Sequence, residues 1–330
     1  MPPDGADATH SLIGPAAGAF TALLWVLTSL FFATAGRRIP VTAVNTVRIV
    51  LAIVLLGITH VILHGTLLPD IATQRQWIML ALSGLIGLSL CDQALFTAFV
   101  DIGPRRALLC MTTSPIFALG FGAAFLGEQI PWLAYVAIAV TIGGVLWVIS
   151  ERSTPDDAGP DAPPTRLRRG VILAMIGAVS QAAGGMFGKI GMGVGWLPTA
   201  DQLDAQGATL VRMVFGLFGM APIVLIFVVI SRKGDGPGEP RRWTSGLMLT
   251  AAGTIVGPFL GVWMSLIAFK YSPLAVAQTL FSLSPVLILP FSRYVLRERV
   301  TRRAVIGAIV ALLGASALAF SEQIQAAITG

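Results

Sequence analysis

The stretch SPIFALGFGAAFLGEQI, from Ser114 to Ile130, returns in modified form as SPVLILPFSRYVLRERV, from Ser284 to Val300. The two copies are separated by an offset of 170 in the numbering, since 114 + 170 = 284. Ser, Pro, Leu, Phe, Leu and Glu recur at matching places, and the closing Ile is replaced by Val. An apolar segment that ends on one Glu in both places indicates that a larger unit of the chain has been duplicated.

The match extends well beyond these two segments. Further pairs at the offset of 170 are Gly87 and Gly257, Ala98–Phe99 and Ala268–Phe269, and Gly144 and Gly314. Earlier in each half, NTVRIV at 45–50 resembles TLVRMV at 209–214, which aligns Arg48 with Arg212 at an offset of 164. A change in the length of one connection explains the smaller offset, so each half is one copy of the same unit.

The composition indicates a membrane protein. Of the 330 residues, 55% are apolar and 12% are charged, and the mean hydropathy is +0.82. Soluble proteins are about 25% charged, so this much apolar surface does not fit a water-soluble core. The net charge of +6 comes from short basic clusters between apolar runs, which the positive-inside rule explains better than nucleic-acid binding does. We therefore expect a multi-pass protein of the cell membrane.

Ten apolar runs are long enough to cross a bilayer, which takes about 17–25 residues. They cover residues 15–34, 44–63, 78–100, 107–126, 132–150, 171–190, 209–231, 246–269, 274–292 and 304–320. A linker rich in Pro and acids, 151–170, separates a first unit at 15–150 from a second at 171–320. Since each unit has an odd number of spans, the second must enter the membrane upside down. The predicted fold is an all-α membrane protein with ten transmembrane helices as two inverted five-helix repeats.

The chain resembles the drug/metabolite transporter superfamily, specifically its ten-helix EamA type, over about residues 15–320. The resemblance rests on an Arg that opens the second helix of each half, on Pro115 and Pro285, and on LGEQI and LRERV before each fifth helix. Arg297 departs from the commoner Leu-Gly-Glu. The resemblance implies a secondary transporter that works by alternating access and exports a small metabolite such as an amino acid.

Basic residues are unevenly distributed between the two ends of the predicted spans. Of the 22 Lys and Arg, only Arg75, Lys189, Arg212 and Lys270 lie toward the connections that follow even-numbered spans. The positive-inside rule then places the odd-numbered connections in the cytoplasm and both termini outside. The resemblance favours cytoplasmic termini instead, and a reporter fused to the C-terminus decides between these orientations.

Asp92, followed by Gln93, is the acid that lies deepest inside an apolar run. Ionisable groups at such depth are costly and are candidates for function. The carboxylate either couples transport to protons or contacts substrate, with Gln93 beside it, or else makes a structural hydrogen bond to a neighbouring helix. The first run has no acid, unlike that of the small multidrug exporters of the superfamily, which use a glutamate there. We therefore do not expect a direct copy of their proton–drug mechanism.

Four uncharged side chains inside the runs are further candidates for substrate contact: Gln181, Gln278, Trp25 and Trp263. The two amides bind a substrate or hold helices together, and interhelical polar bonds contribute about 0.6 kcal/mol each. The two indoles line a cavity or pack in the core. Pro258, close to Trp263, removes a backbone donor and is expected to loosen its helix.

Three basic side chains near the ends of runs are candidates for contact with an anionic substrate. Arg48 and Arg212 open the second helix of each half, and Lys189 lies near the end of the sixth run. Snorkelling to the membrane interface is the ordinary role of such residues. Attraction of a carboxylate inside a cavity is the alternative.

Motifs of catalysis are lacking in the sequence. There is no Gly-x-x-x-x-Gly-Lys-Ser/Thr loop, no Ser/His/Asp arrangement and no zinc signature, so we expect no enzyme, no cofactor and no metal. His60 and His64 have the spacing of two ligands on one helix face but lack an evident third. Glu128 and Glu298 are expected to serve helix starts, where carboxylates bind free N–H groups.

The predicted function is therefore secondary transport. The expected partners are a small-molecule substrate and the lipid bilayer, with protons as the candidate coupling ion, and the expected assembly is a monomer or homodimer. A lipid scramblase or a non-transport scaffold is the alternative function.

Overall fold

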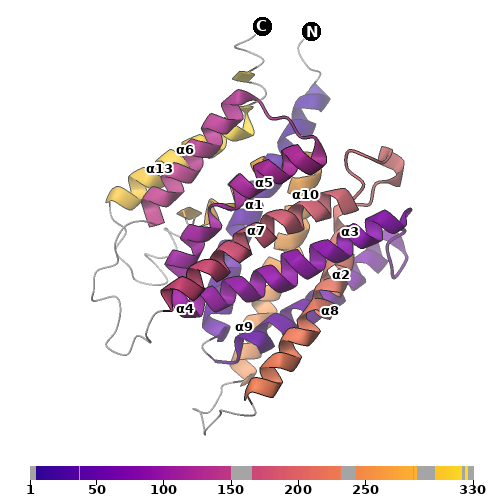
Figure 1. Cartoon of the computed structure of the whole chain (residues 1–330). Coiled ribbons are helices and arrows are strands. Elements are labelled where there is room, and N and C mark those ends of the chain that lie inside the picture. Colours follow the sequence, from indigo (N-terminus) through magenta and orange to yellow (C-terminus); the bar gives the residue numbers. More distant parts are fainter. Residues whose placement is uncertain are drawn as a thin grey trace.

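The computed structural model describes residues 5–36, 38–149, 166–231, 243–284, 286–287, 302–321 and 324–325. Within these ranges the chain forms helices and no β-strand (Figure 1). The prediction of an all-α membrane protein is confirmed.

The helices follow the predicted order of spans. The first half contains α1 (Gly5–Gly36), α2 (Val41–His64), α3 (Gln74–Gly84), α4 (Cys91–Met111), α5 (Ser114–Phe121) and α6 (Trp132–Ile149). The second half contains α7 (Leu167–Gly191), α8 (Ala205–Ser231), α9 (Trp243–Thr254), α10 (Val262–Tyr271), α11 (Leu274–Phe281) and α13 (Arg302–Ala319). Three π-helical segments continue these helices: η1 (Leu85–Leu90) joins α3 to α4, η2 (Gly122–Leu126) extends α5, and η5 (Ile255–Gly261) joins α9 to α10.

Six stretches are long and apolar enough to cross a membrane, and they match the predicted spans one, two, three, six, seven and eight. They are Leu12–Gly36, Thr42–His64, Gln74–Ala98, Leu167–Gly191, Ala205–Leu225 and Trp243–Tyr271. Shorter apolar helices at Ser114–Leu126, Trp132–Trp147 and Val305–Ala319 correspond to spans four, five and ten. The predicted ninth span, 274–292, lies only partly within the described residues.

Local signals set the ends of the helices around the second connection. Helix α2 stops at Gly65, whose φ of 72° is left-handed and suits glycine. Helix α3 begins with a capping box, in which the Gln76 amide donates to the Thr73 hydroxyl and the Thr73 amide donates to Gln76 Oε1. These two signals separate α2 from α3 by a short exposed turn.

The third and eighth spans each contain a π-helical segment at the same place in the repeat. Segment η1 begins at Leu85 and η5 at Ile255, which is again the offset of 170. Pro258 lies in η5, where its missing amide hydrogen agrees with the predicted loosening. However, η1 contains no proline. The π geometry therefore belongs to the repeat rather than to proline alone, and such segments are frequent at functional sites.

The connection predicted between the third and fourth spans lies inside α4, which folds back on itself. A Cβ placed on Gly177 of α7 would lie 3.7 Å from the carbonyl oxygen of Cys91 and 3.2 Å from Met111 Sδ. Cys91 and Met111 are the two ends of α4, and a straight helix of this length is about 30 Å long. The chain therefore reverses within α4, and its two limbs both pack against α7 (Figure 1).

Helices α6 and α13 cross at a symmetric contact, in which each helix uses the residues that are equivalent to those of the other. A Cβ on Gly144 would meet the amide nitrogen of Ala311 at 2.5 Å, and a Cβ on Gly314 would meet that of Thr141 at 2.7 Å. Both pairs, Gly144 with Gly314 and Thr141 with Ala311, are related by the offset of 170. Numbers rise along α6 as they fall along α13, so the equivalent helices run in opposite directions. This is the geometry of an inverted repeat.

The first helix of each half follows a third offset. A Cβ on Gly14 of α1 would overlap residues 271–272, and a Cβ on Gly170 of α7 would overlap residues 101–102. The two target pairs are related by the offset of 170, whereas Gly14 and Gly170 are related by an offset of 156. Helix α1 therefore packs on the eighth span as α7 packs on the third.

A second pair of contacts supports the offset of 156. Gly257 faces the side chain of Thr28, and Gly87 faces Gly184. Thr28 and Gly184 are related by the offset of 156, and Gly87 and Gly257 by the offset of 170. The register between the two halves is thus known for every helix that surrounds the polar residues discussed below.

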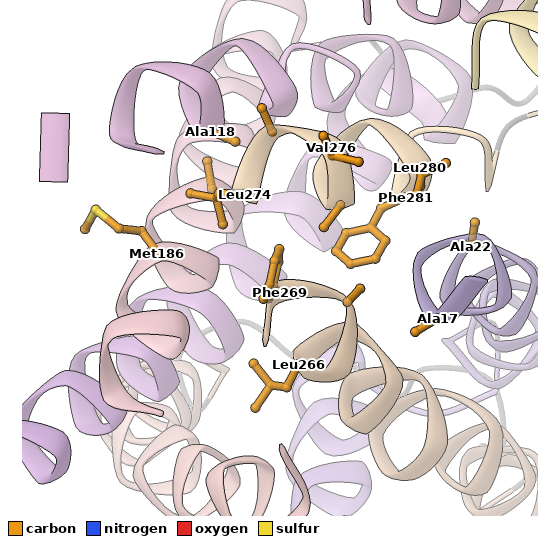
Figure 2. Close-up of a cluster of buried hydrophobic side chains, with 14 of the residues drawn as sticks. Ala17, Ala22, Ala118, Met186, Leu266, Phe269, Leu274, Val276, Leu280 and Phe281 are labelled. Atoms are coloured by element: carbon orange, nitrogen blue, oxygen red, sulfur yellow. The ribbon is translucent and has the colours of Figure 1, made fainter. Parts of the chain in front are cut away.

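Among the described residues, the main apolar core extends over both halves, and Figure 2 shows the part of it where the first, fourth, sixth, eighth and ninth spans meet. Phe281 of α11 packs its ring against Trp25 of α1 at 5.0 Å and against Phe269 of α10 at 5.3 Å between centroids. Small residues such as Ala17, Ala22 and Ala118 let the backbones approach closely. This core joins helices of both halves and borders the polar residues in the membrane interior.

Candidate functional site

Asp92 forms an ion pair with Arg48. Asp92 is in the first turn of α4, directly after η1, and its Oδ2 accepts from Nη2 of Arg48 on α2. The Arg48 guanidinium also lies over the rings of Phe32 and Phe96, at 5.6 and 5.4 Å from their centroids. Arg48 is only 8% exposed. Its position is therefore that of a buried partner of Asp92 and not of a snorkelling side chain.

Gln93, like Asp92, is hydrogen-bonded to a residue of α2. Its Oε1 lies 3.5 Å from Nδ2 of Asn45 on α2. Asn45 is fully buried, and its own side-chain oxygen has no hydrogen-bond partner. Sequence reasoning missed Asn45, although it is a polar residue near the start of an apolar run, one turn before Arg48.

The two glutamine candidates belong to one polar chain that joins the halves. Gln278 of α11 lies 3.4 Å from the Ser114 hydroxyl and donates to the Gln181 carbonyl oxygen at 3.2 Å. The Cys91 thiol lies 3.5 Å from Gln181 Oε1. Ser114 is the first residue of the duplicated stretch, and Cys91 precedes Asp92. The structure thus connects the candidates Gln181 and Gln278 to the start of α4.

The two tryptophan candidates lie one in each half, Trp25 on α1 and Trp263 on α10. Trp25 is the counterpart of Gln181 at the offset of 156, and it faces Gly261, the counterpart of Cys91. Trp263 packs against Phe259 at 6.0 Å between ring centroids. Both indoles are partly buried and border the main apolar core. The contact between Cys91 and Gln181 is polar, whereas the equivalent contact between Gly261 and Trp25 is made by an aromatic side chain.

Arg212 is buried without the partners that Arg48 has. It is 4% exposed, and its Nε and Nη1 atoms have no hydrogen-bond partner. Its side chain reaches from α8 toward η1 and α7, since Cβ atoms on Gly87 and Gly188 would lie 3.2 Å from Nη2 and 3.7 Å from Nη1. The structure therefore separates the two arginines that the sequence treats alike.

Lys189 takes part in a polar knot, which consists of Glu128, Lys189, Ser272 and Leu274. Lys189 Nζ lies 2.6 Å from Glu128 Oε1 and 2.6 Å from the Ser272 carbonyl oxygen. The Leu274 amide donates to Glu128 Oε2 at 2.7 Å. The knot ties together the connections after spans four, six and eight, all at one end of the bundle.

Glu128 serves a helix start, but not that of its own helix. It precedes α6, and sequence reasoning expected it to act there. It instead accepts from the first amide of α11, in the other half of the chain. Glu298, its counterpart in the repeat, lies outside the described residues. The pairing of Glu128 with Lys189 was missed because it depends on helix packing.

The two histidines form a local polar contact. His60 Nδ1 lies 2.7 Å from Gln206 Oε1, and the imidazole rings of His60 and His64 stack at 4.4 Å between centroids. His64 Nε2 lies 3.8 Å from Asp204 Oδ1. Among the described residues, no group of three or more His, Cys, Asp or Glu is placed to hold a metal ion.

A groove and a small cavity lie in the described part of the chain, and neither is lined by Asp92 or Arg212. A groove of about 380 Å³ runs along one face of α7 and is lined mainly by apolar side chains between Val171 and Ser180. A cavity of about 80 Å³ lies beside the polar knot and is lined in part by Pro15, Tyr271 and Ser272.

Comparison with known proteins agrees with this architecture. The family described as "EamA-like transporter family" matches the chain at residues 12–150 and again at 168–320. A solved structure titled "Crystal structure of protein" has a TM-score of 0.68 at 18% identity, covering 94% of this chain and 95% of its own. At this identity the likeness concerns the fold alone. No curated protein matches the chain.

Proposed function

Because the chain belongs to the EamA-like transporter family, we propose that it exports a small metabolite, such as an amino acid, by alternating access. The family is one of drug/metabolite transporters, which carry small molecules across the bilayer. The two transport units are residues 15–150 and 171–320, joined by the linker 151–170. The cell membrane is the proposed location.

The observation that carries the proposal is the inverted equivalence of the two halves. Gly144 faces α13 as Gly314 faces α6, and the packing of α7 on the third span is repeated by α1 on the eighth. Two equivalent halves in opposite orientation can exchange conformations, so that one site opens first to one side and then to the other.

The polar knot supports a closed state at one end of the carrier. The Lys189–Glu128 pair and its bonds to Ser272 and Leu274 hold three connections together. The counterpart of Lys189 at the offset of 156 is the apolar Ala33, so the same charge pair cannot form at the opposite end. By the distribution of basic residues, the end with the knot faces outward. Breaking it is the proposed step that releases an exported substrate.

Asp92 supports coupling to protons or to substrate. It is the only acid near the middle of its span, and its carboxylate is held by Arg48. For Asp92 to bind a proton or a substrate, Arg48 has to move away from it. Helices α2 and α4 pack together in the first half. Alternating access requires that half to rearrange, and this rearrangement supplies the movement. Gln93, Gln181 and Gln278 then offer polar contacts, and Trp25 and Trp263 offer apolar ones.

Exchange in proteoliposomes tests the proposal. Vesicles containing the purified full-length protein are loaded with unlabelled amino acids one at a time, and entry of the labelled form is measured. Saturable counterflow of at least one of them supports the carrier. The same vesicles are assayed with a fluorescent phospholipid. Lipid movement without counterflow, or neither activity, contradicts the proposal.

A further inference from the structure

The surroundings of Arg48 and Arg212 can be compared position by position, because the three offsets of the repeat are known. Around Arg48 stand Asp92, Phe32 and Phe96. The counterparts around Arg212 follow by arithmetic: 92 + 170 gives Val262, 96 + 170 gives Leu266, and 32 + 156 gives Gly188. The second copy thus keeps the arginine and replaces its carboxylate and both of its aromatic partners.

The contacts of Arg212 agree with this comparison. Gly188 lies against the guanidinium, as its position in the repeat requires. Val262 packs on the small apolar cluster that contains Leu210 and Met213, the neighbours of Arg212 on α8. Arg212 is almost completely buried, and two of its guanidinium nitrogen atoms lack hydrogen-bond partners. A buried charge in this condition is costly unless something pairs with it.

The two arginines lie near one carboxylate. Asp92 is bonded to Arg48. Arg212 reaches η1, the segment that ends directly before Cys91 and Asp92, since a Cβ on Gly87 would lie 3.2 Å from its Nη2. Two cations and one anion leave this part of the membrane interior with one positive charge in excess. One further negative charge would balance it.

We infer that Arg212 binds the carboxylate of the transported metabolite, which takes the place that Asp92 occupies beside Arg48. The inference rests on the proposed transport function and names the chemical class of its substrate. Charge-assisted hydrogen bonds between guanidinium and carboxylate are strong, and Nε and Nη1 are the Arg212 atoms still without partners to make them. Arg48, already paired, holds Asp92 and does not contact the ligand.

Thermal unfolding of the detergent-purified full-length protein tests the binding. The probes are the common L-amino acids, acetate and benzoate, each compared with its carboxamide. At least one carboxylate should raise the unfolding temperature by a few degrees, and its carboxamide should not. Arg212→Gln should abolish this shift. Arg75→Gln is the matched control, since Arg75 lies at the exposed start of α3 against Trp196, and it should leave the shift unchanged.

A shift that persists in Arg212→Gln, carboxamides that act like carboxylates, or a panel without any effect overturns the inference. Failure of transport is a separate outcome. Counterflow that is equal for carboxylate and carboxamide keeps the carrier and rejects the carboxylate site. A shift that depends on Arg212 in a protein without counterflow keeps the site and rejects the carrier.

A second variant tests the same site without any ligand. Val262→Asp places a carboxylate at the position equivalent to Asp92, and Val262→Asn is its uncharged control. If Arg212 lacks a partner there, Val262→Asp should unfold at a higher temperature than Val262→Asn and should no longer respond to carboxylate probes. The difference between the two should vanish in the Arg212→Gln background. Equal unfolding temperatures, or a persisting response to probes, contradict the inference.

Discussion

Glu128 Oε1 lies 2.6 Å from Lys189 Nζ, and this pair holds an end of the first half to an end of the second. The Lys189 side chain is 9% exposed and the Glu128 side chain 15% exposed, so both charges are largely shielded from solvent. Glu128 also holds the first amide of α11, so the pair fixes the position of the ninth span. A carrier that opens at this end must separate the two residues.

Replacing Lys189 should therefore favour the conformation that is open at the knot. In Lys189→Met, Glu128 keeps its charge without a partner, and a membrane-impermeant maleimide should label Ser272→Cys several times faster than in the parent protein. Lys189→Arg keeps the charge and should retain slow labelling. Lys270→Met is a control at the same end, because Lys270 donates to the Leu203 carbonyl oxygen rather than to the knot. Equal labelling in Lys189→Met and Lys270→Met would argue against a gate.

The Arg48–Asp92 pair should show strong coupling in unfolding measurements. Removing one partner of a buried pair costs about 3–5 kcal/mol, because the other charge is left buried. Arg48→Leu should lower the free energy of unfolding by that order, and Arg48→Leu/Asp92→Asn should recover part of the loss. Additive effects of the two changes would mean that the pair contributes nothing as a pair.

Asp92→Asn should lower transport while the protein stays folded. The amide keeps an oxygen that can accept from Arg48, but it can neither ionise nor release a proton. Counterflow rates in proteoliposomes measure the effect, and monodisperse elution from a sizing column measures folding. Gln93→Glu is not a suitable control because it adds a charge, whereas Gln129→Asn changes a polar residue in the exposed turn before α6. Transport at the wild-type rate in Asp92→Asn would remove the proton-coupling role.

Two adjacent glycines in α6 should respond in opposite ways to a methyl group. A Cβ on Gly144 would meet the backbone of Ala311 at 2.5 Å, whereas a Cβ on Gly143 meets nothing within 4 Å. Gly144→Ala should force α6 and α13 apart and lower the unfolding temperature. Gly143→Ala should be neutral or stabilising by up to about 1 kcal/mol, since alanine favours the helix. Similar losses in both variants would contradict the symmetric crossing.

The spans and the duplication could be predicted because both are written along the chain. Hydropathy depends on consecutive residues, so Thr42–His64 and Leu167–Gly191 appear close to their predicted positions. The predicted break between residues 100 and 107 falls within α4, where the chain reverses, although the helix assignment continues through it. The offset of 156 for the first helix is hidden in the sequence, because equivalent positions of α1 and α7 differ in residue type, as in Thr28 and Gly184 or Trp25 and Gln181.

The partners of the candidate residues could not be predicted from local patterns. Arg48 and Asp92 are 44 apart in the numbering, and Glu128 and Lys189 are 61 apart. Each pair forms because two helices pack in one register, which neither periodicity nor composition specifies. The deep acid itself was visible from its position in an apolar run. Which of the three basic candidates stays without a partner became visible only in the packed structure.

The central claim is that the protein exposes its site alternately to the two sides of the membrane, and a reversible lock at the knot tests it most directly. The variant Glu128→Cys/Lys189→Cys is reconstituted, treated with a short bifunctional methanethiosulfonate, and assayed for counterflow before and after reduction. We predict that exchange is present before cross-linking, stops when the two cysteines are joined, and returns with reductant. The same treatment should leave the exchange rate of either single cysteine variant unchanged. Undiminished exchange in the cross-linked protein would contradict alternating access through this end.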